Sequence, residues 1–299
     1  MMNFGKVLTA MVTPFDNHGK IDLKKTADLI DYLLANGTDG LVVAGTTGES
    51  PTLSADEKVE LWKQVVQVVK GRVPVIAGSG SNSTDKSIHL SKRAEEAGVD
   101  AVMLVAPYYN KPDQRGLYQH FKTIAEAIDL PVMIYNVPGR SVVRLTPDTV
   151  VSLSHIKNIV SVKEATGDLD GMSEIISRTD DSFSLYSGDD NLTLPSYAIG
   201  AHGIISVSSH IIGNEMQTML KLYEEGKDKK AAALHRKLLP LMKGMFSAPS
   251  PTPVKAALKM VGIDTGGVRL PLVPLSDKDL ESIHQIINKV KSNGTEKGV

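Results

Sequence analysis

The chain has 299 residues, of which 41% are hydrophobic, and its formal net charge is −1. This length suits one large barrel or two smaller domains, and the near-neutral charge favours neither a nucleic acid nor an anionic membrane as a partner. No apolar run is long enough to span a bilayer, and the first residues lack the apolar segment of a signal peptide. Cysteine is absent, which excludes disulfides, thiolate metal ligands and cysteine nucleophiles. These features predict a globular protein of the cytoplasm.

Short apolar runs alternate with segments of helical periodicity up to about residue 226. The helical segments begin at residues such as Ser54, which forms a capping box with Glu57, and end at glycines such as Gly37. The apolar runs are rich in β-branched residues, which is typical of strands in a parallel sheet. Eight strands are therefore expected, at residues 7–12, 41–44, 73–77, 101–105, 132–135, 158–163, 184–186 and 203–207.

Eight consecutive βα units predict a closed (β/α)8 TIM barrel, an α/β fold. The alternative is an open doubly wound sheet, which more often carries a glycine-rich fingerprint after its first strand, where this chain has Thr13-Pro14. Beyond Gly226 the strands stop, and helices are expected at 228–245, 253–261 and from 276 onward. We therefore expect a barrel domain over residues 1–226 and a C-terminal three-helix domain over 227–299, with a frayed tail from Ser292.

Lys163 lies at the expected C-terminal end of the sixth strand, directly before the small and polar residues 164–167. Active sites of (β/α)8 barrels lie at this end of the strands. A lysine amine held there can act as a nucleophile toward a carbonyl carbon. The alternative interpretation is a lysine that simply reaches solvent at a strand end.

Two loops at the same expected end of the barrel carry groups suited to a carboxylate. In the loop of residues 45–49 (GTTGE), glycines allow the backbone to approach a ligand closely, and the hydroxyls of Thr46 and Thr47 with free N–H groups can form an anion-binding nest. Arg140 follows a Pro-Gly turn, where its guanidinium can pair with a carboxylate. Taken singly, the loop can also be an ordinary βα turn, and Arg140 a surface arginine.

Tyrosines follow the fourth and fifth strands, at Tyr108, Tyr109 and Tyr135. Phenols linked to other hydroxyls can relay protons, although these tyrosines can also simply cap the barrel rim. Asp189 and Asp190 follow the seventh strand, and we interpret one of them as the N-cap of the next helix rather than as a metal ligand. The histidines show no paired metal-ligand spacing, so no catalytic metal is expected.

Together these groups describe a Schiff-base site. Lys163 would attack a ketone, hydroxyls would move protons, and loop N–H groups would hold a carboxylate. Because the iminium is itself the electron sink in such chemistry, we expect no metal or organic cofactor.

Five motifs, in this order, resemble the pyruvate-dependent class I aldolases of the dihydrodipicolinate synthase and N-acetylneuraminate lyase family. The resemblance extends over essentially the whole chain. The motifs are residues 45–50 (GTTGES), 107–110 (PYYN), 135–140 (YNVPGR), 162–165 (VKEA) and 187–190 (SGDD).

The resemblance implies four catalytic residues. Lys163 would form the Schiff base with pyruvate, and Tyr135 would be the general acid/base. Tyr135 would share a proton relay with Thr46 and with Tyr109, the latter donated by a neighbouring subunit.

It also implies four substrate-binding residues. Thr47 and its backbone would hold the pyruvate carboxylate, and Arg140 would bind the carboxylate of L-aspartate 4-semialdehyde. Gly188 and the backbone of Ile205 would line the pocket.

The implied reaction condenses pyruvate with this aldehyde, as the first committed step toward diaminopimelate and lysine. The implied assembly is a homotetramer built as a dimer of tight dimers. Two alternatives stay open: a related aldolase that acts on a sugar acid or sialic acid, and a non-catalytic sensor of small carboxylates.

In family members that lysine inhibits, an allosteric pocket uses two histidines and a glutamate. The matching positions here are Ala55, Lys58 and Lys86, although Ser50, Asn82 and Tyr108 are retained. Two added cations would repel the ammonium group of lysine. The resemblance therefore predicts an enzyme that is insensitive to lysine.

Overall fold

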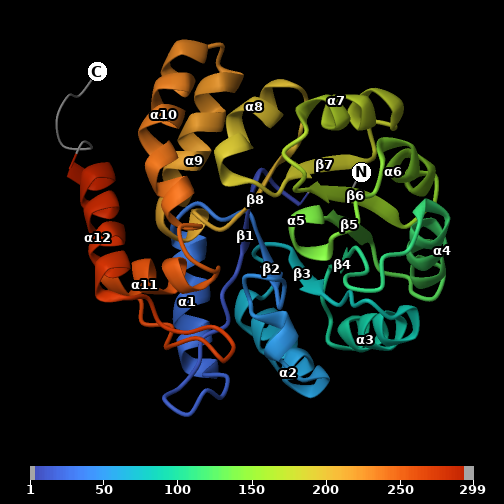
Figure 1. Cartoon of the computed structure of the whole chain (residues 1–299), viewed down its shortest axis with the longest axis horizontal. Coiled ribbons are helices and arrows are strands. Elements are labelled where there is room, and N and C mark those ends of the chain that lie inside the picture. The colour runs from blue at the N-terminus through green and yellow to red at the C-terminus, as the bar shows by residue number, and fades with distance from the viewer. Residues whose placement is uncertain (1–3, 293–299) are drawn as a thin grey trace.

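The computed structural model describes residues 4–292 and shows a closed barrel of eight parallel strands that pair in sequence order (Figure 1). The predicted (β/α)8 fold is therefore confirmed. The frayed tail expected beyond Ser292 lies outside the described residues. The strands are β1 Val7–Ala10, β2 Gly40–Val43, β3 Val75–Gly78, β4 Ala101–Val105, β5 Val132–Asn136, β6 Ile159–Glu164, β7 Ser184–Ser187 and β8 Gly203–Ser206.

Helices surround the barrel as predicted, including the capping box of Ser54 and Glu57. One short helix, α5, replaces the expected turn after β5, because proline at its first turn favours helical geometry and Val142 in the left-handed region ends it. The helices are α1 Leu23–Ala35, α2 Ala55–Val69, α3 Thr84–Glu96, α4 Gln114–Ala125, α5 Pro138–Ser141, α6 Pro147–Ser154, α7 Leu169–Arg178, α8 Thr193–Ala198, α9 Ser209–Glu224, α10 Asp228–Gly244, α11 Thr252–Met260 and α12 Asp277–Ser292.

Two layers of apolar side chains stabilise this arrangement. One cluster fills the barrel interior, where Leu8, Val42, Met133 and Ile205 are almost fully buried. The larger cluster lies between the outer face of the strands and the helices. Because both faces of each strand are covered, the strands are apolar on both sides, which explains their continuous runs of β-branched residues.

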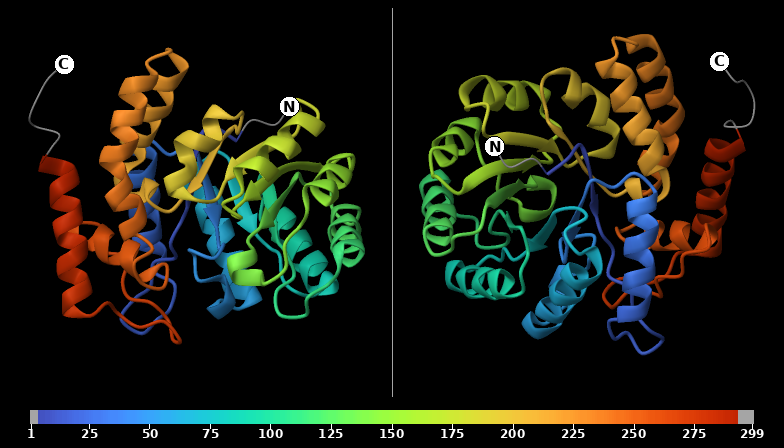
Figure 2. Two further views of the ribbon diagram at one scale, coloured as in Figure 1. Left: turned by 45° about the horizontal axis from the view of Figure 1, so that its top comes forward. Right: turned by 180° about the vertical axis from the view of Figure 1, so that it is seen from behind.

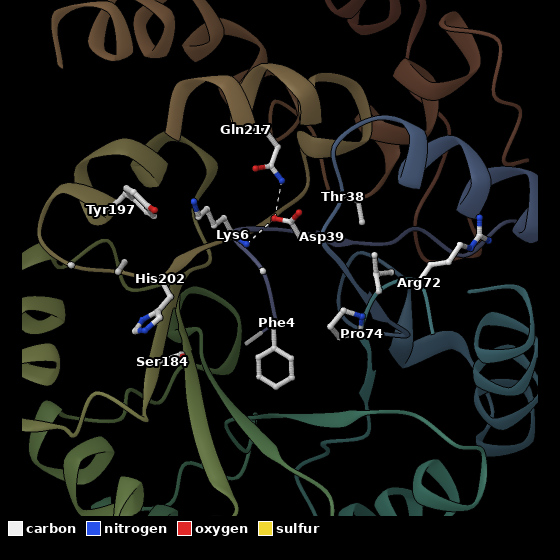
Figure 3. Close-up of a pocket in the computed structure, with 14 residues that line it drawn as sticks. Phe4, Lys6, Thr38, Asp39, Arg72, Pro74, Ser184, Tyr197, His202 and Gln217 are labelled. Atoms are coloured by element: carbon white, nitrogen blue, oxygen red, sulfur yellow. Dashed lines mark hydrogen bonds between the residues drawn. The ribbon is translucent and has the colours of Figure 1, made fainter. Parts of the chain in front are cut away.

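The end of the barrel at which the strands begin is organised by one carboxylate. Asp39 Oδ2 accepts hydrogen bonds from the backbone N–H groups of Lys6 and Val7 at 2.8 and 3.0 Å, and from Gln217 Nε2 at 2.7 Å. Figure 3 shows Asp39 between Lys6 and Gln217, beside a hollow of about 770 Å³. The bonds join the start of β1 to α9, so this end of the barrel serves stability, as is typical of the fold.

The last three helices pack on one side of the barrel. α10 lies along α9, and α12 lies against α10 and α11 (Figures 1 and 2). Leu238 and Leu241 of α10, and Leu258 of α11, are buried in the same apolar cluster as the outer face of the barrel. The barrel and the last three helices therefore share one apolar core. The expected division into domains at residue 226 stays a prediction.

His210 makes the stability of the barrel sensitive to acid. Its Nε2 accepts from Val12 N–H at 3.2 Å, and its Nδ1 bonds Val207 O at 2.8 Å, so the ring bridges the segments after β1 and β8. Burial lowers the pKa of His210 to about 4. Because the unfolded chain takes up this proton near pH 6.5, folding stability should be lost as the pH falls from about 6.5 to 4, by about 3 kcal/mol from this group.

The expected result is a smaller difference in urea stability between pH 7.5 and pH 5 for His210→Gln than for the unmodified protein. His18→Gln, which changes an exposed histidine, is the matched control and should keep the full difference. An unaltered pH dependence in His210→Gln would contradict the assignment.

Candidate active site

A cavity of about 280 Å³ opens at the C-terminal ends of β2 to β5. Of the residues expected at the site, it brings together Thr46, Tyr135 and Arg140. The other lining residues are Ala44, Gly45, Ser50, Pro51, Lys58, Gly78, Gly80, Ser81, Met103, Val105, Tyr108, Val137 and Ser141. A concave, mixed apolar and polar surface at this end of a barrel is the usual form of a small-molecule site.

Lys163 is the last residue but one of β6 and lies directly against Tyr135. Its side chain is almost fully buried, and its Nζ lies 4.2 Å from the centroid of the Tyr135 ring. Strand register explains this contact, because Tyr135 of β5 and Lys163 of β6 are paired residues on neighbouring strands. The Lys163 amine and the Tyr135 ring, two of the residues expected at the site, are therefore in contact.

Gly188 makes room for Lys163. A Cβ at position 188 would lie 2.7 Å from Ala165 Cβ and 3.0 Å from Lys163 Cε, closer than such atoms normally approach. The Gly188 N–H donates to Glu164 O at 2.7 Å, which holds the loop after β7 against the end of β6. A side chain at this position would therefore displace the amine.

Asn136 and Glu164 form a buried pair directly beside Tyr135 and Lys163. Asn136 Nδ2 lies 3.0 Å from Glu164 Oε2, and the Asn136 amide also bonds both backbone groups of Leu145 at 3.0 Å. Burial raises the pKa of Glu164 to about 7, against hydrogen bonds from Asn136 and Thr166. The pair joins the ends of β5 and β6 and anchors the segment after Arg140. The sequence did not predict this role. Asn136 and Glu164 directly follow Tyr135 and Lys163, and adjacent residues of a strand point to opposite faces of the sheet.

The loop of residues 45–50 is a tight turn over the end of β2. Ser50 N–H donates to Gly45 O at 3.2 Å, and Thr13 Oγ1 donates to Gly48 O at 2.7 Å. Thr46 reaches the cavity, whereas Thr47 is buried and does not line it. Glu49 takes the left-handed conformation, with φ of 58°, which is uncommon for a residue with a side chain.

Asp189 stands at the N-cap position of a short 3-10 helix at residues 190–192, but neither Asp189 nor Asp190 caps a helix with its side chain, so the predicted side-chain cap is wrong. α8 begins without a side-chain cap, and Asp190 Oδ2 instead accepts from Val207 N–H, Ser208 N–H and Ser208 Oγ at 3.2, 2.8 and 2.7 Å. This carboxylate therefore joins the loops after β7 and β8. Burial raises the pKa of Asp189, against the opposing effect of the positive charge of Lys163.

Two further expected residues, Ile205 and Tyr109, do not line the cavity. Ile205 is fully buried in the barrel interior, in the same apolar cluster as Tyr135. Tyr108 lines the cavity, but Tyr109 is 88% exposed and has φ of 75°. Within one subunit the Tyr109 side chain therefore lies largely in solvent.

Lys58 of α2 lines the cavity, although it was expected only at the position of a regulatory pocket. It is buried, and desolvation lowers its pKa to about 8. Within residues 4–292, no group of three His, Cys, Asp or Glu side chains is arranged to hold a metal ion. No helix in the same described range is long and apolar enough to cross a membrane.

A closed (β/α)8 barrel with a buried lysine facing a tyrosine at the strand ends defines the class of barrel aldolases. The family model described as "Dihydrodipicolinate synthetase family" matches residues 3–290. The chain belongs to this family, and it is an enzyme of the lyase class.

Known relatives match nearly the whole chain in sequence and in structure. The 4-hydroxy-tetrahydrodipicolinate synthase of Bacillus subtilis is 59% identical over 290 residues, which is 97% of this chain and 100% of the relative. A dihydrodipicolinate synthase from Bacillus anthracis has a crystal structure similar to this one, with a TM-score of 0.95 at 59% identity, covering 96% of this chain and 99% of that chain. The chloride-inhibited dihydrodipicolinate synthase from Acinetobacter baumannii, crystallised with pyruvate, gives a TM-score of 0.93 at 39% identity, covering 97% and 99%.

Proposed function

We propose that this enzyme condenses pyruvate with L-aspartate 4-semialdehyde to give 4-hydroxy-tetrahydrodipicolinate, the first committed step toward diaminopimelate and lysine, in the cytoplasm. The observation that carries the proposal is the contact of Lys163 Nζ with the Tyr135 ring, next to a cavity that Thr46 and Arg140 also line. The names of the relatives and the pyruvate bound to one of them support the choice of substrates.

The proposed chemistry begins with attack of the neutral Lys163 amine on the ketone carbon of pyruvate. Loss of water gives an iminium ion, and loss of a methyl proton gives an enamine. The enamine carbon attacks the aldehyde carbon, which forms the new carbon–carbon bond and a hydroxyl group. Attack of the amino group of the second substrate on the iminium carbon then closes the ring and frees Lys163. No step requires a metal or organic cofactor.

The remaining residues move protons and hold carboxylates. Tyr135 takes and returns the protons, in relay with Thr46 and with Tyr109 of a neighbouring subunit. Thr47 and its backbone hold the pyruvate carboxylate, while Gly188 and the backbone of Ile205 shape the pocket around Lys163. The high exposure of Tyr109 supports a role across a subunit interface, and hence the homotetramer, a dimer of tight dimers.

The reaction is tested with purified enzyme, pyruvate and L-aspartate 4-semialdehyde, coupled to the downstream reductase and followed by loss of NADPH. Turnover that requires both substrates supports the proposal. Absence of turnover with pyruvate still trapped on Lys163 by borohydride would favour the alternative aldolase acting on a sugar acid or sialic acid. Absence of trapping would favour the non-catalytic sensor.

Arg140→Ala should damage the use of the semialdehyde far more than the use of pyruvate. Arg140 is exposed at the cavity wall, where a charged hydrogen bond to a carboxylate contributes about 1.5–3 kcal/mol. We expect kcat/KM for the semialdehyde to fall by about 10- to 100-fold, with pyruvate trapping unchanged.

Arg144→Ala is the matched control, because Arg144 is also exposed but pairs with Asp168 and does not line the cavity. Equal losses in both variants would contradict the specific role of Arg140.

L-lysine should not inhibit this enzyme. Lys58 is buried and its side chain lines the cavity. Lys86 is exposed on α3, a few residues after Ser81, which belongs to the cavity wall. Positive charge at these positions opposes binding of an ammonium group. The initial rate at saturating substrates should stay constant up to millimolar L-lysine, and substantial inhibition at low millimolar concentration would overturn this prediction.

A further inference from the structure

The linkers of the C-terminal region reach the loop that carries Thr46. Residues 261–276 join α11 to α12 and lie beside the β1–α1 loop. Phe15 N–H donates to Thr265 O at 3.0 Å, and a Cβ at Gly266 would lie 2.0 Å from Phe15 O, so the two backbones are in direct contact. The C-terminal region is therefore seated on the side of the barrel that holds residues 45–50.

A buried ion pair joins this region to Glu49. Lys255 Nζ of α11 lies 2.8 Å from Glu49 Oε1, and the two side chains are only 3% and 1% exposed. Glu49 Oε2 accepts the backbone N–H of Arg269 at 2.9 Å. Both carboxylate oxygens of Glu49 are thus held by residues more than 200 positions later in the chain.

Further contacts hold the Lys255 ammonium group and the Arg269 guanidinium in place. Lys255 Nζ donates to Gly267 O at 2.6 Å, and it lies 4.2 Å from the centroid of the Phe15 ring, with the Arg269 guanidinium 4.5 Å from the same centroid. Arg269 also bonds Glu57 and the carbonyl oxygen of Thr52, on the far side of the loop. Burial lowers the pKa of Lys255 to about 8, so its amine keeps a positive charge at neutral pH.

Glu49 transmits this anchoring to the site. Its N–H donates to Thr46 O at 3.1 Å, and its backbone is in the left-handed region, which a residue with a side chain adopts only when surrounding contacts impose it. A buried carboxylate without its cation would be strongly unfavourable, so loss of Lys255 should release Glu49 toward solvent. The turn that presents Thr46 and Thr47 would then change shape.

We propose that Lys255 and Arg269, acting through Glu49, are positioning residues that hold the Thr46-Thr47 turn in the conformation that binds pyruvate. The inference rests on the proposed function of this turn as the carboxylate and proton-relay site. It assigns to the C-terminal helical region a part in catalysis, although none of the residues described there, up to 292, lines the cavity.

The test compares Glu49→Gln and Lys255→Met with the unmodified enzyme in the rate of borohydride trapping of pyruvate on Lys163. Glu49→Gln keeps the shape and an oxygen for the Arg269 N–H but removes the charge, so it should fold even if Lys255→Met does not. We expect the apparent pyruvate affinity and the rate of Schiff-base formation together to fall by about 10- to 100-fold, the range observed when a small displacement misaligns reacting groups.

Lys25→Met is the matched control. Lys25 pairs with Asp264 at 2.7 Å and so also joins the barrel to the C-terminal linker, but it makes no contact with Glu49. Its trapping kinetics should be unchanged even if its thermal stability falls.

Trapping does not involve the aldehyde, so this test separates two failures. Failure of the unmodified enzyme to trap pyruvate would overturn the proposed function. Normal trapping by the unmodified enzyme together with normal kinetics in Glu49→Gln, whatever its thermal stability, would overturn the positioning role. Equal kinetic losses in Glu49→Gln and Lys25→Met would overturn it as well, because the effect would then be general loosening of the C-terminal region.

Discussion

Lys163→Ala is expected to lower turnover by about 10⁴-fold or more, the scale of loss when a covalent enzyme is deprived of its nucleophile. The physical reason is that alanine offers no amine to form the iminium, so no enamine is available for bond formation. The measurements are steady-state turnover with both substrates and the mass of the protein after borohydride treatment with pyruvate. The variant should show no mass increase.

Lys157→Ala is the control for this prediction, since Lys157 is an exposed lysine just before β6. It should keep both turnover and trapping at the level of the unmodified enzyme. Trapping of pyruvate on a different lysine in Lys163→Ala, with turnover retained, would show that the nucleophile has been misassigned.

Tyr135→Phe is expected to lower kcat by about 10²- to 10⁴-fold, the usual contribution of a positioned general acid/base. The substitution keeps the ring against which Lys163 Nζ lies and removes only the hydroxyl. Pyruvate should therefore still bind, while the proton transfers of iminium formation and bond formation become slow. Stopped-flow trapping and steady-state kinetics separate these effects.

Tyr186→Phe is the matched control, because Tyr186 of β7 also lies in the barrel interior and pairs with Lys163 from the other side of β6. Its hydroxyl donates to Gly5 O at 3.0 Å at the opposite end of the barrel. Losing this bond should cost about 1 kcal/mol of stability and leave kcat unchanged. If Tyr186→Phe lowered kcat as much as Tyr135→Phe, a specific proton-transfer role for Tyr135 would be untenable.

Much of the fold followed from local patterns. Alternating β-branched runs and amphipathic segments determine strands and helices locally, and eight such units leave a closed barrel as the arrangement that buries both faces of every strand. The short helix α5 was expected as a turn, because four residues are too few to show helical periodicity.

The site was predictable where a residue's role follows from its place at the end of a strand. Lys163 and Tyr135 lie near the C-terminal ends of neighbouring strands, so parallel pairing brings them together once the strand order is known. Asp190 shows the opposite case. Its position before a helix suggested an N-cap, but its partners Val207 and Ser208 lie after β8 and cannot be inferred from local sequence.

The sequence by itself determined the barrel, and it predicted which side chains follow the C-terminal ends of the strands and what chemistry an amine, phenols and an arginine can perform there. Only the tertiary structure decided which of these groups share a cavity, why there is no room for a side chain at position 188, and how Lys255 and Arg269 hold Glu49. The physical reason is the range of the interactions. Hydrophobic periodicity acts over a few residues and can be seen locally, whereas buried ion pairs and close packing join residues distant in the chain.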